Sequence, residues 1–495
     1  MRVHLAIVPS NFGGVRRGAI RDHTLSSLNY VPSTAMVSSL SPAFGLTLRD
    51  VMTGEELREH LRAVMSLDEI RSLANEYGVV ERQRQLDIVE LVIALVLSGG
   101  THEGGRPYDT LRRYLESGAP SIARSAFYAW FTAPLERLLS ELLTRAITQG
   151  QAQAKLLPGI LRGVGDWRIF DSTTVKLPDA LKGLYPGTGD YAAIKLHKEF
   201  SVGTGNLVGY QLSPARDHDS PFLIIDESRR GTGLLIDLGY ASVARLAECE
   251  TYDVRYVLRL KDNWKPRVDR LVRGTITREV LEGEDFDVLL DNDVLLLDGR
   301  AIDADVTIGR SGQTVRSRLI GLHTPKGYCF FLTNIARGTH GPHQVGDLYR
   351  IRWEIEVDNK VDKAGARLDE ISARKDVSVR ILLLASLLNT TIARTIVQSE
   401  KLSIRKGRAP AQQAERPPLH PILLMRALAI AHTTITQLLH DDAPRSNEWG
   451  ALMARLRRLG HDPNWRKRPS VLDKVQGLTA PPGRKRNAKA RASAA

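Results

Sequence analysis

The chain is poor in cysteine and aromatic residues and has no long uninterrupted apolar run. Its two cysteines, Cys249 and Cys329, exclude a disulfide scaffold and a cysteine-based zinc site, and they are typical of a reducing compartment. The first ten residues have neither the apolar stretch nor the cleavage pattern of a secretory signal. The longest apolar runs, Val89–Leu97 and Ile381–Val397, are short or interrupted by polar residues. We therefore expect a soluble cytoplasmic protein without a membrane span.

Acidic residues are in deficit. The 495 residues include 69 Lys and Arg against 56 Asp and Glu, which gives a formal net charge of +13. A surplus of this size favours a polyanionic partner, with nucleic acid ahead of an acidic membrane. The length allows two or three domains, each with its own core.

The character of the sequence changes several times along the chain. Apolar residues at spacings of three and four predict helices, and short β-branched or aromatic runs predict strands. The expected segments are a disordered leader (1–45), a helical domain (46–155), a mixed α/β region (160–263), a β-rich region (264–340), a helical return (341–400), a C-terminal helical region (401–480) and a basic disordered tail (481–495).

The helical domain contains a candidate DNA-reading helix. Residues 107–131 predict two helices joined by a Gly-Ala-Pro turn, with Ser121 capping the second helix. Arg124, Ser125 and Tyr128 would lie along one side of that helix, as groove recognition requires. An ordinary hairpin of a helical bundle explains the pattern equally well.

The α/β region predicts a mixed sheet. Its order is strand, hairpin, helix, strand, helix, strand. These elements are Trp167–Leu177, the hairpin Ile194–Val202 with Asn206–Pro214, Ser220–Arg230, Gly233–Tyr240, Ser242–Tyr252 and Val254–Leu260. The run Asp217-His218-Asp219 resembles a metal motif in composition, but capping of a helix at Ser220 is the simpler interpretation.

Three acids are placed where a metal site could form. Asp171 and Asp237 each end a predicted strand, and Glu356 lies in a predicted helix. Carboxylates gathered without a cation repel each other, and two divalent ions, about 3.5–4 Å apart, remove that repulsion and support phosphodiester chemistry. Oxygen ligands suit magnesium or manganese. Taken singly, an aspartate at a strand end is more often a turn or a helix cap.

The helix of Glu356 carries a regular stripe. Tyr349, Arg352, Glu356 and Lys363 follow at spacings that would place them on one face of an α-helix. The stripe combines a carboxylate with two cations able to bind phosphates. A solvated face with an Arg352–Glu356 ion pair is the structural alternative.

The spacing Tyr-x2-Arg-x3-Glu-x6-Lys resembles the signature of bacterial insertion-sequence transposases of the IS-four family, which are DDE enzymes. The strand-end blocks DSTTVKLP and IDLGYAS resemble the family's first two acid blocks. The runs FLTN and DPNWRKRPSVLDK are also similar to family motifs. The resemblance covers about residues 167–399 and the short C-terminal motif.

This resemblance implies an α/β fold: an RNase H-like catalytic core with a β-rich insertion, preceded by an all-helical DNA-binding domain and followed by a helical C-terminal segment. It implies that Asp171, Asp237 and Glu356 hold two Mg²⁺ or Mn²⁺ ions. It also implies that Tyr349, Arg352 and Lys363 contact the phosphates of the element end.

The implied activity is cut-and-paste transposition in the bacterial cytoplasm, at the nucleoid. The enzyme would bind the inverted repeats of its own element as a homodimer, cleave the ends and join the 3′-hydroxyls to target DNA. In relatives an insertion aromatic stacks on a flipped base of a hairpin end. The candidates are Trp264, Tyr328 and Phe330, although Cys329 occupies the compared position and core packing explains each aromatic as well.

Two other functions fit the same residues. One is a metal-dependent nuclease on the same core that does not join strands. The other is a catalytically inactive DNA-binding derivative. The basic tail, with Arg484, Lys485, Arg486, Lys489 and Arg491, would add salt-sensitive affinity for DNA or would simply be solvated.

Overall fold

The computed structural model describes residues 52–80, 86–98, 106–310, 312–406, 419–441, 443, 445–465, 467 and 470–478. The predicted leader and basic tail lie outside these residues. The helices are α1 (Gly54–Val64), α2 (Leu67–Glu76), α3 (Ile88–Leu97), α4 (Arg106–Glu116), α5 (Arg124–Tyr128), α6 (Ala133–Ala152), α7 (Val243–Thr251), α8 (Phe286–Asp291), α9 (Pro342–Arg350), α10 (Glu354–Lys360), α11 (Asp376–Lys406), α13 (Pro421–Ile430), α14 (His432–His440), α15 (Ser446–Gly460) and α16 (Val471–Val475). The strands are β1 (Trp167–Leu177), β2 (Ala192–Ser201), β3 (Asn206–Pro214), β4 (Gly233–Ile236), β5 (Arg255–Arg259), β6 (Arg267–Arg273), β7 (Thr275–Ile276), β8 (Glu284–Asp285), β9 (Leu295–Leu296), β10 (Ile302–Arg310), β11 (Gln313–Thr324) and β12 (Gly327–Thr333).

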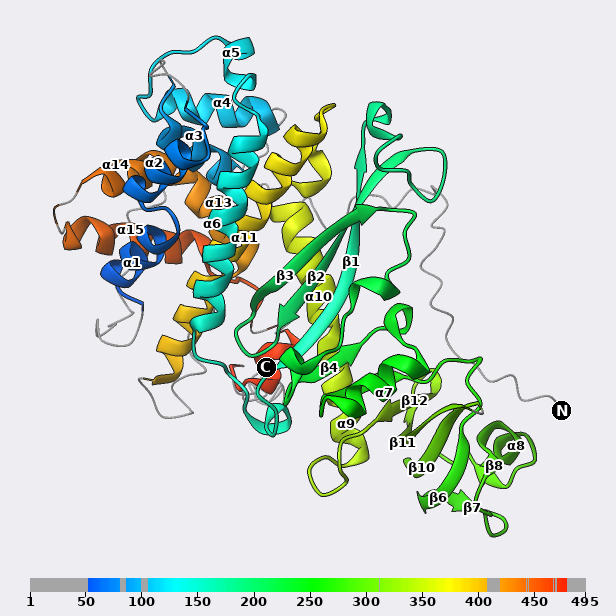
Figure 1. The fold of residues 1–495 in the computed structure, drawn as a ribbon. Coiled ribbons are helices and arrows are strands. Elements are labelled where there is room, and N and C mark those ends of the chain that lie inside the picture. Colours follow the sequence, from blue (N-terminus) through cyan, green and yellow to red (C-terminus); the bar gives the residue numbers. More distant parts are fainter. Residues whose placement is uncertain are drawn as a thin grey trace, which may run out of the picture.

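One ten-stranded sheet runs through the protein in the order β3-β2-β1-β4-β5-β12-β11-β10-β6-β8 (Figure 1). Strands β1, β2 and β3 are antiparallel neighbours, whereas β4 pairs parallel to β1 and β5 pairs parallel to β4. The predicted hairpin is therefore confirmed, and the protein has the expected mixed α/β sheet.

The β-rich region continues this sheet. Strand β12 pairs antiparallel with β5, and β11, β10 and β6 follow outward from it. A single apolar cluster joins both parts, since Leu234 and Tyr256 of the first part share it with Val306 and Leu319 of the second. This shared core fixes the position of the β-rich region against β5.

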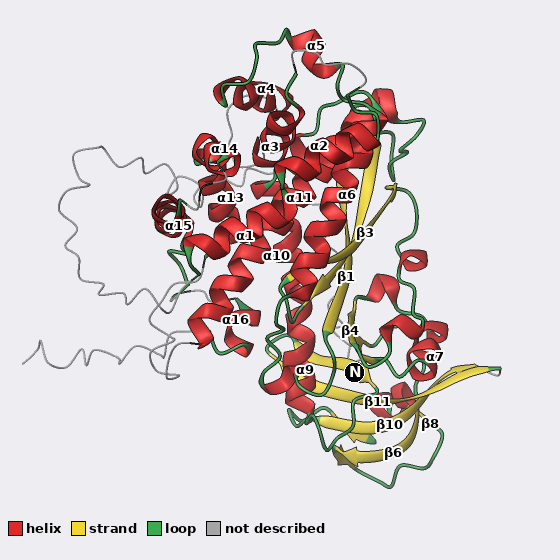
Figure 2. Ribbon diagram, turned by 60° about the vertical axis from the view of Figure 1, so that its left-hand side comes forward, coloured by secondary structure: helices red, strands yellow, loops and turns green. Residues whose placement is uncertain are grey.

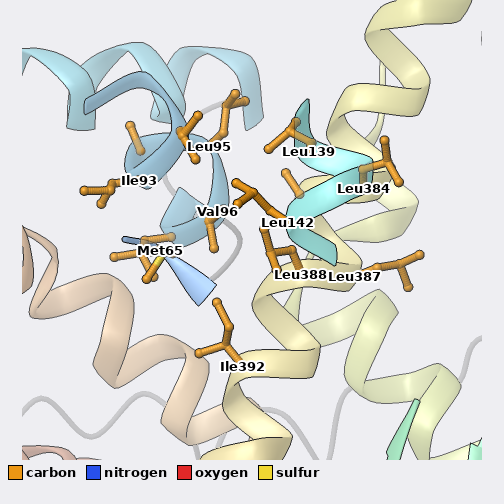
Figure 3. Close-up of a cluster of buried hydrophobic side chains, with 14 of the residues drawn as sticks. Met65, Ile93, Leu95, Val96, Leu139, Leu142, Leu384, Leu387, Leu388 and Ile392 are labelled. Atoms are coloured by element: carbon orange, nitrogen blue, oxygen red, sulfur yellow. The ribbon is translucent and has the colours of Figure 1, made fainter. Parts of the chain in front are cut away.

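The helices at both ends of the described chain form one helical body beside the long strands (Figure 2). Helices α1 to α4 and α6 pack with α11 and α13 to α15 around a common apolar core, part of which is drawn in Figure 3. Helix α11 is long and apolar enough to span a membrane by length and composition, yet its whole apolar window is buried inside the protein. Helix α11 is therefore a core helix of the protein.

Two helices bring this body against the sheet. Helices α6 and α11 both contact β3, and α10 contacts β1. Asn206 of β3 donates to Thr395 Oγ1 of α11 at 2.8 Å, and Gly150 of α6 lies so close to Asn206 that a Cβ there would come within 2.3 Å of its amide. Close helix–strand packing thus fixes α10 and α11 relative to β1.

Two predicted local features are wrong. Residues Ser220–Arg230 form short 3₁₀ turns at Ser220–Phe222 and Glu227–Arg229 instead of a helix. Between the turns, Leu223 and Ile225 are buried and Ile224 is 58% exposed, so the segment buries alternate residues as an extended chain does. Helix α5 has only five residues, and its N-cap is Ala123 rather than Ser121.

Candidate active site

Asp171 and Asp237 come from neighbouring parallel strands. Trp167 is level with Gly233 and Ile169 with Leu235, so the same register continued by two residues places Asp171 beside Asp237. Asp237 directly follows β4, and its Oδ2 accepts a hydrogen bond from the Gly239 amide at 3.3 Å.

Asp171 does not end its strand, contrary to the prediction. Strand β1 continues to Leu177 because its other edge stays paired with β2 as far as Ala192. Asp171 is instead the point at which the β4 side of β1 has lost its partner strand, which leaves that edge open to other side chains.

Glu356 and Arg352 join this pair from the helical segment 342–365. The Nη1 atom of Arg352 lies 3.5 Å from Asp237 Oδ1, and its Nη2 atom lies 2.9 Å from Glu356 Oε1. One guanidinium therefore bridges the second and third predicted acids. The Nδ2 atom of Asn359 donates to Asp171 Oδ2 at 2.8 Å, which brings the first acid to the same helix.

Burial dominates the electrostatics of the site. It raises the pKa of Asp171 to about 6, and Asp237 adds to the rise, while the Ser172 backbone amide, Arg352 and Lys198 oppose it. Burial also raises the pKa of Tyr349 to about 12, so its hydroxyl stays protonated at neutral pH. At a pH above about 6 the Asp171 carboxylate is ionised but poorly hydrated, and a nearby cation would stabilise this state.

The donor chemistry of these acids fits hard divalent cations. Asp171, Asp237 and Glu356 offer only carboxylate oxygens, as magnesium and manganese prefer. Within the described part of the chain, no three His, Cys, Asp or Glu side chains stand close enough to share an ion. The Arg352 guanidinium lies between Asp237 and Glu356 and pairs with both carboxylates.

The predicted stripe does not lie on a uniform α-helix. A 3₁₀ turn at Ile351–Trp353 separates α9 from α10, and a π-turn at Val361–Gly365 follows α10. Tyr349 packs on Phe331 with ring centres 5.2 Å apart, and Arg352 lies over the Tyr349 ring at 5.8 Å. Lys363 lies in the π-turn, half-buried, and makes no ion pair with any residue that the structure describes.

A buried charge network holds this helical segment against the sheet. Lys198 of β2 bonds the carboxylates of both Asp358 and Asp362, and Arg394 of α11 also pairs with Asp358. All four side chains are buried, so each charge depends on the others for stabilisation. Lys198 is also the cross-strand partner of Asp171. The only sequence signal of this network is the spacing of four residues between Asp358 and Asp362.

Asp219 precedes the 3₁₀ turn at Ser220, as predicted, but its side chain makes no capping hydrogen bond there. Its Oδ1 instead accepts from Ser172 Oγ at 3.0 Å and lies 2.9 Å from Lys195 Nζ. A Cβ added to Gly239 would lie 3.8 Å from Asp237 Oδ2 and 3.9 Å from Asp219 Oδ2. Asp219 therefore faces the same loop as Asp237.

The three candidate aromatics line one cavity of about 270 Å³ at the start of the β-rich region. Phe330 is a core residue, only 8% exposed and edge-on to Phe286. The Tyr328 hydroxyl is engaged by the Gly299 amide and the Arg300 carbonyl, each at 2.8 Å. Trp264 is partly exposed with Lys261 above its ring at 5.8 Å, which leaves it the most available of the three for a ligand.

The candidate DNA-reading residues lie far from the acids. Helix α5 stands at the outer end of the helical body in both views (Figures 1 and 2). Arg124 and Ser125 are exposed, and the Arg124 guanidinium covers the half-buried Tyr128 ring at 5.6 Å. A cation beside an aromatic ring is suitable for DNA contact, but the short helix presents little more than one turn.

Comparison with known proteins places this geometry in a family. Residues 163–392, which include Asp171, Asp237 and Glu356, match the transposase DDE domain. The transposases of insertion sequences IS231B and IS231C from Bacillus thuringiensis subsp. berliner are each 24% identical to the chain, over 230 and 347 residues. Residues 163–392 therefore form a transposase DDE domain, and the chain is similar to insertion-sequence transposases.

The extent of these matches differs between relatives. The IS231B match covers 38% of this chain and 48% of that relative, and the IS231C match covers 61% and 70%. The IS231E transposase from Bacillus thuringiensis subsp. finitimus is 33% identical over 42% of this chain and 44% of its own. A cryo-EM structure of the piggyBac transposase synaptic complex with hairpin DNA is similar with a TM-score of 0.44 and 14% identity, covering 84% of this chain and 87% of that one.

Proposed function

We propose that this protein is a transposase that binds the terminal inverted repeats of its own element, cleaves DNA at the element ends with two divalent ions, and joins the 3′-hydroxyl ends to target DNA. The observation that carries the proposal is that residues of one short helical segment contact all three distant acids. Arg352 pairs with Asp237 and Glu356, and Asn359, three residues beyond Glu356, bonds Asp171. The proposed RNase H-like core is supported by the order β3-β2-β1-β4-β5 with β4 and β5 parallel to β1.

Each side chain has a role in this chemistry. Asp171, Asp237 and Glu356 would hold Mg²⁺ or Mn²⁺, which supplies an activated nucleophile and stabilises the leaving oxygen. Arg352 is already held over the Tyr349 ring, so it is oriented toward the acids and available to a phosphate that approaches them. Lys363, without an ion-pair partner in the described chain, would attract a second phosphate.

The remaining regions would bind DNA. The cavity beside Trp264 also contains Arg259, Lys261 and Lys265, so a base stacked on the indole would have cations near its phosphates. This arrangement supports hairpin ends as an intermediate. The helical body would recognise the inverted repeat through Arg124, Ser125 and Tyr128. Two ends cleaved together call for a homodimer, acting at the nucleoid in the bacterial cytoplasm.

The test is cleavage of a labelled duplex that contains the inverted repeat flanking the coding region. We expect Asp171→Ala, Asp237→Ala and Glu356→Ala each to lose cleavage in Mg²⁺ or Mn²⁺ and to keep end binding in EDTA. Asp347→Ala is the matched control, because Asp347 is an exposed acid of the neighbouring helix α9. Undiminished cleavage by any of the three variants would refute the assignment.

The products of the same assay separate the transposase from its alternatives. Strand joining to a target plasmid supports transposition. Hydrolysis without joining indicates a nuclease on the same core, and end binding with no cleavage in either metal indicates an inactive derivative.

A further inference from the structure

Asn359 makes one polar contact at the site, and it is with an acid of the proposed triad. Its Nδ2 donates to Asp171 Oδ2 at 2.8 Å, whereas its Oδ1 is buried and accepts no hydrogen bond from the described residues. An ionised carboxylate can only accept, so the donor in this contact is the amide nitrogen. Among the described residues, Asp171 is therefore the hydrogen-bond partner of this amide, through its nitrogen, and the amide oxygen has none.

Buried ion pairs hold the helix backbone on both sides of Asn359. Asp358 and Asp362, on either side of it, both bond the buried Lys198 of β2, and Arg394 of α11 also holds Asp358. Lys198 is the register partner of Asp171 across β1 and β2. The network thus fixes Asn359 against the strand that carries Asp171, at the same level of the sheet.

The position of Asn359 on the helix relates it to the third acid. It follows Glu356 by three residues within α10, so both side chains lie on neighbouring turns of one helix face. A side chain here can reach Asp171 while Glu356 reaches Arg352. The helix therefore controls two of the three acids, one as its own residue and one through Asn359.

We propose that Asn359 is a positioning residue that orients the Asp171 carboxylate for divalent cation binding. This inference rests on the proposed function, because it assumes that Asp171 is a metal ligand. Hydrogen-bond partners that orient metal-binding groups commonly change metal affinity by roughly 10-fold to 100-fold when removed.

The experiment measures Mn²⁺ binding to the full-length protein by titration calorimetry, together with thermal melting and end binding in EDTA. We expect Asn359→Ala to raise the half-saturating Mn²⁺ concentration roughly tenfold or more and to leave metal-free end binding unchanged. Val357→Ala is the matched control, because it removes apolar side-chain atoms from the same helix without removing a polar contact to the acids. It should change the melting temperature without changing Mn²⁺ affinity.

Asn359→Asp is the second variant, in case alanine prevents folding. It keeps the side-chain volume but sets a carboxylate against Asp171, so we expect a lower melting temperature without metal and a larger rise on adding Mn²⁺ than in the wild type. Wild-type affinity in Asn359→Ala, or wild-type melting of Asn359→Asp with and without Mn²⁺, would overturn the inference. Failure of the wild type itself to bind Mn²⁺ would instead overturn the proposed function.

Discussion

The buried Asp171 carboxylate offers a test of the site that needs no DNA. Replacing it with asparagine removes a charge from a position where burial raises the pKa from 3.8 to about 6. The amide oxygen of the new side chain can still accept the hydrogen bond from Asn359. The substitution therefore changes the charge and little else.

The expected effect follows from the pKa difference. A carboxyl group whose pKa is higher in the folded state favours folding when protonated, and that advantage is lost as the pH rises from about 3.8 through about 6. Each pKa unit corresponds to about 1.4 kcal/mol, so the wild type loses up to about 3 kcal/mol, and partial exposure of Asp171 reduces this to about 2–3 kcal/mol. Asp171→Asn should be more stable than the wild type by about that amount at pH 8 in EDTA, and equal to it near pH 4.

The assay is urea unfolding followed by tryptophan fluorescence at several pH values, with and without Mn²⁺. Trp167, fully buried at the start of the same strand, reports the local transition. Mn²⁺ should stabilise the wild type but not Asp171→Asn. The control is Asp68→Asn, since the Asp68 side chain is 96% exposed and its loss should change stability little at any pH. A lower stability of Asp171→Asn at pH 8, or a difference independent of pH, would refute the reasoning.

Four further predictions test other parts of the chain. Lys198→Met leaves the buried carboxylates of Asp358 and Asp362 without their shared cation. The substitution should lower the free energy of unfolding by about 3–5 kcal/mol, measured by urea titration. An unfolding midpoint equal to that of the wild type would contradict the stabilising role of the network. Trp264→Ala should weaken stacking of a 2-aminopurine base at the element end by about 1–3 kcal/mol, measured by the fluorescence of that base. Fluorescence equal to that with the wild type would exclude Trp264 as the stacking residue. In contrast, Phe330→Ala should reduce fold stability by about 3–5 kcal/mol, because Phe330 is a core residue. Deleting residues 481–495 should flatten the salt dependence of DNA binding, and an unchanged slope would mean that the tail makes no phosphate contacts.

Local patterns predicted the elements that depend on neighbours in sequence. The hairpin of β2 and β3 follows from two alternating runs separated by a Gly-Thr-Gly turn, and the structure has it there. The same approach failed for Ser220–Arg230, where apolar residues typical of a helix bury alternate side chains in an extended segment. Whether such a run becomes helix or extended chain depends on the surface that covers it, and that surface lies elsewhere in the chain.

The sequence by itself determined which acids were candidates, because residue type, strand ends and the Tyr-Arg-Glu-Lys spacing are all local properties of the chain. Only the tertiary structure decided what surrounds them. Arg352 bridges two of the acids, Asn359 holds the third, and Lys198 binds the helix to the sheet. Each of these three residues contacts at least one partner that is more than one hundred residues away in the sequence. Such contacts follow from strand register and helix packing, which no local pattern specifies.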